Sequence, residues 1–108
     1  MTDTYAGFFQ ALSHPSRLRL LKLLSQRDAM SVSELTERMP QEGSTISRHL
    51  AMLRLNGLVV VHQQGKKRYY SMDRPLIERR LEAFVTDELQ GVQDPGGTRP
   101  DESPVRAP

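Results

Sequence analysis

The residues whose types and spacing could do chemistry gather in one acid-free stretch, Gly43 to Met72. This stretch contains five Lys or Arg residues and no Asp or Glu, whereas the whole chain of 108 residues has 15 basic and 13 acidic residues. Small hydroxyl side chains and one arginine come first, and a run of three cations comes last. Short polar side chains and Arg can hydrogen-bond base edges, and Lys and Arg neutralise phosphates. The candidate residues for binding double-stranded DNA are Ser44, Thr45, Ser47, Arg48, Gln64, Lys66, Lys67 and Arg68.

The same stretch predicts the elements that would present these side chains. Residues 44–56 are predicted to form a helix that ends at Gly57, because glycine readily takes the left-handed conformation of a helix C-terminus. The apolar side of this helix, spaced at i, i+3, i+4 and i+7, comprises Ile46, His49, Leu50 and Leu53. Residues 58–63 and 67–72 are rich in Val and Tyr, which predicts two strands around a turn at 64–66.

A second, shorter helix is predicted just before the first. It would run from Glu34 to Met39 with Ser33 as its N-cap, and the link that follows contains Pro40 and Gly43. Because this link is short, the two helices should cross at a steep angle and leave the second free to protrude. The order of elements predicts a mainly α protein with a β-hairpin, namely a winged helix-turn-helix with five helices and a two-stranded wing.

The remaining helices carry apolar stripes that predict a dimer. A first helix is expected from Thr4 to Leu12 and a fifth after an Asp73 cap, each with one apolar stripe. A second helix is expected from Pro15, and its Leu residues on nearly all sides predict that it is buried in the middle of the domain. Soluble monomers seldom leave such apolar area exposed, and a two-fold contact between the first and last helices would cover it. The candidate interface residues are Tyr5, Phe8, Phe9, Leu12, Ile77, Leu81, Phe84 and Val85.

Composition argues against several other classes of protein. The chain has no Cys, so thiolate metal sites and disulfides are excluded. Its three histidines, His14, His49 and His62, are far apart, and no nucleophile has a base at meaningful spacing. We interpret His14 as a helix cap, His49 as a hydrogen-bonded packing residue and His62 as a surface residue. The sequence therefore predicts no enzyme, no cofactor and no metal.

The chain divides into two parts of different composition. Residues 1–90 are predicted to form the DNA-binding and dimerisation domain, and residues 91–108, rich in Pro and Gly with one Val, a disordered tail. No apolar run of 18 residues exists, so we expect no contact with a membrane. The first ten residues lack the basic start of a signal peptide, and we expect a cytoplasmic protein.

Four segments resemble the ArsR/SmtB family of bacterial repressors. They are ALSHPSRLRLLKLL, VSELTERM, STISRHLAMLRLNGLV and GKKRYYSM, and the resemblance extends from about Tyr5 to Leu89. It implies a symmetric dimer of winged helices that represses an operator and is released by an inducer. The family's groove-facing positions match Ser44, Thr45, Ser47 and Arg48, and its wing cations match residues 66–68. The family often has Ser and Gln just before this helix, where Glu42 and Gly43 stand here.

The metal sites common in this family find no ligands in the sequence. Ser31-Val32-Ser33 occupies the place of a Cys-x-Cys pair, and serine hydroxyls do not replace thiolates for soft metals. The last predicted helix carries carboxylates but no His. The resemblance is compatible with an effector ligand, although no residue of the sequence identifies one.

The alternative function is a winged-helix module that binds another protein without reading DNA.

Overall fold

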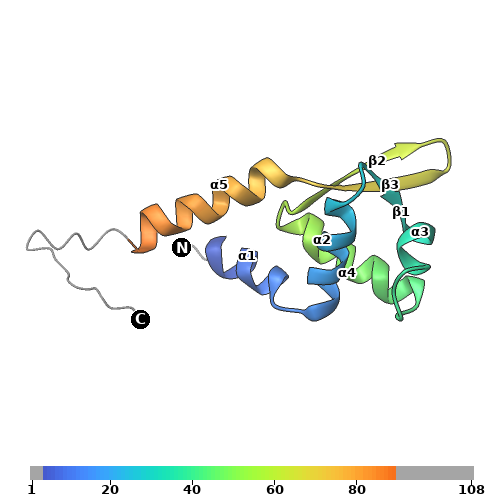
Figure 1. The fold of residues 1–108 in the computed structure, drawn as a ribbon, viewed down its shortest axis with the longest axis horizontal. Helices are drawn as coiled ribbons and strands as arrows, with labels where there is room; N and C mark the ends of the chain where they lie inside the picture. Colours follow the sequence, from blue (N-terminus) through green and yellow to red (C-terminus); the bar gives the residue numbers. More distant parts are fainter. Residues whose placement is uncertain (1–3, 90–108) are drawn as a thin grey trace, which may run out of the picture.

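The computed structural model describes residues 4–89, and within them five α-helices and a small antiparallel sheet form a helix-turn-helix with a wing (Figure 1). The predicted fold class is confirmed, with one strand more than expected. The elements are α1 (Thr4–Leu12), α2 (Pro15–Ser25), β1 (Met30–Ser31), α3 (Val32–Thr36), α4 (Gly43–Leu55), β2 (Val59–Gln64), β3 (Lys67–Met72), α5 (Arg74–Phe84) and a π-helical turn η1 (Val85–Leu89). The wing extends to one end of the molecule and α5 to the other, with α2 and α4 between them (Figure 1).

Local capping signals decide where most helices begin and end. The backbone N–H of Ser16 donates to His14 Nδ1 at 3.1 Å, so His14 caps α2, as predicted. Asp73 caps α5 by accepting from the N–H of Leu76 at 3.1 Å. At the end of α4, Gly57 has a φ of 77°, the left-handed conformation that the sequence predicted.

The start of α3 differs from its prediction. Its N-cap is Ser31, not Ser33, because Ser31 and Glu34 form a capping box: Glu34 N–H donates to Ser31 Oγ at 3.2 Å and Ser31 N–H donates to Glu34 Oε1 at 2.9 Å. The helix therefore begins at Val32 and ends at Thr36, earlier than the predicted Met39. The reciprocal pair satisfies two backbone donors, which a cap at Ser33 would leave open.

The sheet has three strands in the order β1-β3-β2, not the two that the sequence predicted. Met30 pairs with Tyr70 and Ser31 with Tyr69, so a short segment for which the sequence predicted no strand forms the third strand. β2 and β3 pair from Val59 opposite Met72 to Gln64 opposite Lys67. The loop at the wing tip is thus shorter than predicted, and Gly65 in it has a φ of 64°.

The core lies where α2 and α4 cross beneath the sheet. Its fully buried members include Phe8, Ala11, Leu20, Leu24, Met30, Leu35, Ile46, Leu50, Leu53, Leu58 and Val59. Truncation of a leucine in such a core to alanine typically costs about 2–5 kcal/mol of stability. The predicted burial of α2 on nearly all sides is wrong at Leu18, which is 51% exposed, because no element within residues 4–89 covers that side. No helix among the described residues is long and apolar enough to span a membrane.

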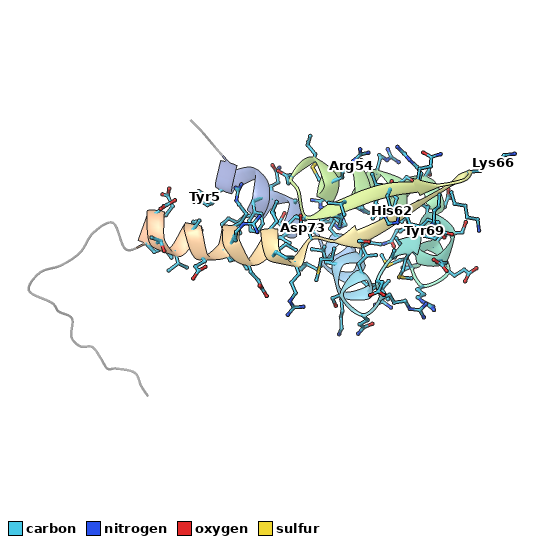
Figure 2. All side chains as sticks on the ribbon, turned by 90° about the horizontal axis from the view of Figure 1, so that it is seen from above. Tyr5, Arg54, His62, Lys66, Tyr69 and Asp73 are labelled. Atoms are coloured by element: carbon cyan, nitrogen blue, oxygen red, sulfur yellow. The ribbon has the colours of Figure 1, made fainter. Side chains whose placement is uncertain are left out.

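Helices α1 and α5 lie side by side and share an aromatic cluster (Figures 1 and 2). The rings of Phe9 and Phe84 are 4.8 Å apart between centroids, and those of Tyr5 and Phe84 are 5.4 Å apart, both edge to face. The Tyr5 hydroxyl donates to Asp87 Oδ2 at 2.9 Å. This hydrogen bond raises the pKa of the Tyr5 phenol and ties the start of α1 to the π-helical turn.

Candidate nucleic-acid interface

Helix α4 has one buried side and one polar side. Ile46, Leu50 and Leu53 are fully buried, which fixes the rotation of the helix about its axis. Ser44, Ser47 and Arg48 are consequently exposed on the other side, and Thr45 is half-buried between the two. The helix begins with no side-chain cap at Glu42, so its first backbone N–H groups have no side-chain acceptor there. Short polar groups, one arginine and helix N-terminal amides together suit contact with a nucleic acid.

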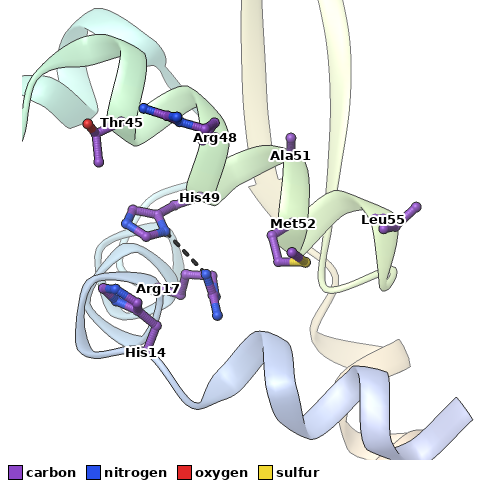
Figure 3. Close-up of a pocket in the computed structure, with 8 residues that line it drawn as sticks. All are labelled: His14, Arg17, Thr45, Arg48, His49, Ala51, Met52 and Leu55. Atoms are coloured by element: carbon purple, nitrogen blue, oxygen red, sulfur yellow. Dashed lines mark hydrogen bonds between the residues drawn. The ribbon is translucent and has the colours of Figure 1, made fainter. Parts of the chain in front are cut away.

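Two polar contacts hold the N-terminal half of α4 on α2. Gln41 Nε2, in the turn before α4, donates to Ser16 Oγ at 2.7 Å. Arg17 Nη1 lies 3.3 Å from His49 Nδ1, and the rings of His14 and His49 are 4.5 Å apart between centroids (Figure 3). His49 is therefore the hydrogen-bonded packing residue that the sequence predicted.

The surroundings of His49 disfavour its protonation. Burial lowers the pKa of the His49 imidazole, and the positive charges or partial charges of His14, Arg17 and Arg48 lower it further. The neutral ring can accept from the Arg17 guanidinium through Nδ1, whereas a protonated ring cannot. The contact between α2 and α4 is thus strongest when His49 is neutral.

The C-terminal end of α4 is held by close packing against α1 and α5. A Cβ atom on Gly7 would lie 2.9 Å from Asn56 Oδ1, so α1 packs closely on this end and an alanine there would require the Asn56 side chain to shift. A Cβ on Gly57 would lie 3.1 Å from Leu76 Cδ1. Both ends of α4 are therefore fixed, and its exposed side has a defined direction in the fold.

The wing presents its polar residues at the tip of β2 and β3. Gln64, Lys66, Lys67 and Arg68 are all exposed, and Figure 2 shows Lys66 at the far end of the hairpin. Behind the tip, the rings of His62 and Tyr69 stack with centroids 6.1 Å apart. A narrow twisted ribbon with cations at its end can follow a phosphate backbone.

Strand β1 couples the wing to the helix-turn-helix. Ser31 both pairs with Tyr69 of β3 and caps α3, so the same residue belongs to the sheet and to the helix start. Ser71 Oγ also donates to the Asp28 carbonyl at 2.8 Å. These bonds fix the wing relative to α3 and α4, which a free two-stranded hairpin would not achieve. A hollow of about 240 Å³ lies between the wing tip and the first residues of α3.

The cations of this surface have no carboxylate partners among the residues that the structure describes. Within residues 4–89 the salt bridge found is Arg74 to Glu78 on α5, at 3.1 Å and well exposed. Arg48, Lys66, Lys67 and Arg68 make no such bridge there. Their charges are available to an anion, and the predicted DNA-binding side of α4 is exposed.

A second hollow, of about 570 Å³, lies on the side of α4 that faces the junction of α1 and α2 (Figure 3). Its walls are His14, Arg17, Thr45, Arg48, His49, Ala51, Met52 and Leu55. This hollow could not be predicted from the sequence, because its walls come from segments about thirty residues apart. Two of its lining residues, Thr45 and Arg48, are also candidates for DNA contact.

The predicted dimer residues divide into three groups. Phe8 is 1% exposed within the single chain, so its assignment to an interface is wrong: the α1 backbone turns its ring into the core. Phe9, Leu12 and Ile77 are half-buried against that core. Tyr5 and Phe84 contact one another, while Leu81 and Val85 are each 41% exposed. Leu89, outside the predicted set, is 62% exposed and extends the same apolar strip.

The described part of the chain holds no group of three or more His, Asp or Glu residues placed to bind a metal ion. The predicted tail, residues 91–108, lies outside the described residues.

The roles of Ser31 and Arg17 were not predicted from the sequence. The Ser31-x-x-Glu34 spacing was a readable signal for the capping box, whereas nothing in the sequence connects Arg17 with His49.

Comparisons with known proteins agree with this geometry. A family described as a helix-turn-helix domain matches residues 12–62. The chain is 37% identical over 76 residues to the HTH-type transcriptional regulator Rv0081 of Mycobacterium tuberculosis, covering 70% of this chain and 67% of that one. It is 39% identical over 86 residues to a transcriptional repressor SmtB homolog of Synechocystis sp., covering 79% and 63%. The solved ArsR-like transcriptional regulator from Rhodococcus sp. RHA1 superposes with a TM-score of 0.72 at 25% identity, covering 81% of each chain.

Proposed function

Because this chain belongs to the ArsR/SmtB family of winged helix-turn-helix transcriptional regulators, we propose that it is a homodimeric repressor that reads a palindromic operator in double-stranded DNA. In this proposal the exposed side of α4 enters the major groove, and the wing contacts phosphates beside it. The proposed DNA-binding residues are Ser44, Thr45, Ser47, Arg48, Gln64, Lys66, Lys67 and Arg68.

The observation that carries the proposal is the direction in which α4 is held. Three buried residues fix its inner side, and the contacts of Gln41 with Ser16 and of Arg17 with His49 fix its inclination. The exposed remainder is the hydroxyl and guanidinium side. Arg48 can bind a guanine in two places at once, which would supply about 1–3 kcal/mol of discrimination between bases.

Dimerisation is proposed from the apolar strip that one chain leaves uncovered. Leu81, Val85 and Leu89 lie exposed along α5 and η1, beside the half-buried rings of Tyr5 and Phe84. A two-fold axis through this strip would bury it against itself. It would also set two α4 helices about 34 Å apart, the spacing of half-sites one helical turn apart. Residues 1–90 would then be one unit that contains both functions.

Selection of bound sequences from a random pool of duplexes tests the proposal. The expected product is an inverted repeat with half-site centres about 10 base pairs apart. The selected duplex should then shift in a gel in the presence of excess random competitor DNA. If no sequence is enriched and competitor abolishes every shift, the chain does not read an operator, and the alternative of a protein-binding winged helix is favoured.

A further inference from the structure

The hollow beside α4 has the dimensions of a small-molecule site. Its volume of about 570 Å³ falls within the range of roughly 300–1,000 Å³ that is typical of ligand pockets. One wall is the start of α2 with His14 and Arg17, and the other is a single strip along α4 (Figure 3). Arg48, Met52 and Leu55 follow one another on that strip at i, i+4 and i+7, so it is about 10 Å long.

The two ends of the hollow differ in chemistry. At one end Arg17, His49 and His14 converge, and Figure 3 shows Arg17 reaching toward His49. At the other end Ala51, Met52 and Leu55 present hydrocarbon and a thioether. Leu55 is 80% exposed and Met52 is 38% exposed, so the apolar end is open to solvent. A site with one polar end and one apolar end fits a ligand that itself has a polar head and an apolar body.

The polar end carries positive charge, and the described part of the chain places no negative charge in its lining. None of the residues lining the hollow is acidic. Arg17 donates to the carbonyls of Ala11 at 2.7 Å and Gln10 at 3.1 Å and contacts His49, and all three partners are neutral acceptors. The lowered pKa of His49, caused by burial and then by His14, Arg17 and Arg48, shows that this end resists a further positive charge. An anion placed here would meet uncompensated charge in a partly desolvated position, where attraction is stronger than in water.

We propose that this hollow is an effector site for an amphipathic anion. The acidic head, a carboxylate or a phosphate, would lie against Arg17 and the His14–His49 pair, and a body about 10 Å long would cover Met52 and Leu55. Each methylene of such a body that is buried raises the affinity by about fourfold. The site itself follows from the hollow and does not require a DNA-binding function.

The regulatory consequence rests on the proposed function. Thr45 and Arg48 line the hollow and are also proposed to contact DNA. A ligand head beside Arg48 would compete for its guanidinium, and a body along α4 would occupy space beside the groove-facing side. Ligand and operator would therefore each weaken the binding of the other by the same factor.

The test compares four probes with one hydrocarbon chain and different heads: octanoate, octyl phosphate, octanol and octylammonium. We expect the full-length protein to bind at least one of the two anions at least tenfold more tightly than octanol and octylammonium, by calorimetry. The methyl resonance of Met52 should shift on the same titration. Comparison of the two anions then distinguishes a carboxylate site from a phosphate site. Equal binding of octanoate, octyl phosphate and octanol, or no binding of any probe, would overturn the proposal.

A matched pair of variants locates the binding. Leu55→Asn replaces an exposed leucine in the hollow, and Leu18→Asn replaces a leucine that is 51% exposed on α2 and does not line it. Both changes conserve charge and affect surface side chains. Leu55→Asn should weaken the binding of the preferred anion at least threefold, and Leu18→Asn should leave it unchanged. Equal effects of the two variants would place the ligand elsewhere.

Operator binding is measured separately on the wild-type chain. A falling affinity for the selected duplex as the preferred anion is added supports competition, and anion binding with unchanged operator affinity overturns it. Anion binding by a chain that selects no duplex would contradict the proposed function while leaving the ligand site in place. The failure of one proposal is thus distinguishable from the failure of the other.

Discussion

Removal of the wing cations should change how operator binding responds to salt. The perturbation is the triple variant Lys66→Ala, Lys67→Ala and Arg68→Ala, at three exposed positions without salt bridges among the described residues. Each phosphate contact contributes about −0.9 to the slope of log K against log salt. Three lost contacts should therefore reduce the magnitude of the slope by about 2.7. Between 50 and 200 mM salt, a fourfold change, the ratio of wild-type to variant affinity should shrink by about 40-fold.

The assay is fluorescence anisotropy of a labelled operator duplex at five or six salt concentrations. The control triple variant is Arg19→Ala, Lys22→Ala and Arg27→Ala, which removes the same charge from exposed positions outside the candidate surface. This control should lower affinity slightly through net charge and leave the slope nearly unchanged. If the wing variant retained the wild-type slope, or if both triple variants changed it equally, the wing would not contact phosphates and our reasoning would be refuted.

Three further predictions follow from α4, α5 and His49. Arg48→Ala should cost about 1–3 kcal/mol on the operator and relax the base preference at one position of the half-site, as measured by competition with single-base variants. Leu81→Glu should shift the protein from dimer to monomer in sedimentation, because a carboxylate would be buried without a partner in the proposed interface. The free energy of unfolding should fall as pH falls below about 6.5, since unfolded His49 takes up a proton at its ordinary pKa of roughly 6.5 and folded His49 does so only at lower pH. His49→Gln should make that decline shallower in urea titrations between pH 7.5 and 5.5, because its side chain does not titrate.

Each of these predictions has a control and a contrary outcome. For Arg48, the control is Arg79→Ala on α5, and equal losses on operator and random duplex would show a phosphate contact instead of a base contact. For Leu81, the control is Leu18→Glu at a similarly exposed leucine, and a dimeric Leu81→Glu protein would contradict the interface. For His49, a pH dependence as steep in the variant as in the wild type would mean that another group titrates.

The local structure was determined by the sequence wherever one residue acts on its own neighbours. Pro15, Asp73 and Gly57 mark helix ends because the proline ring, the Asx cap and the left-handed glycine act within a few positions of the chain. The apolar spacing of 46, 50 and 53 fixed which side of α4 is buried, and therefore which side carries hydroxyls and Arg48. The family resemblance rested on the same local segments, and the comparisons confirm it.

Only the tertiary structure decided the features that join distant segments. Met30 and Ser31 form a strand because the edge of β3 is free to pair with them. The two residues by themselves do not predict a strand. Phe8 and Leu81 both belong to apolar stripes, but Phe8 lies in the core and Leu81 on the surface. The apolar stripe of a helix can be wider than the area that the helix buries against the core, and the remaining residues then stay exposed.

The hollow beside α4 likewise requires Arg17 and His49, two residues distant in sequence, to come together. Their contact links residues far apart in sequence and exists only once α2 and α4 cross. Hydrogen-bonding and apolar periodicity act over a few residues and can be read along the chain. The pairing of β1 with β3, the division of an apolar stripe between core and surface, and the hollow beside α4 all depend on where the rest of the chain lies. Only the tertiary packing decides them.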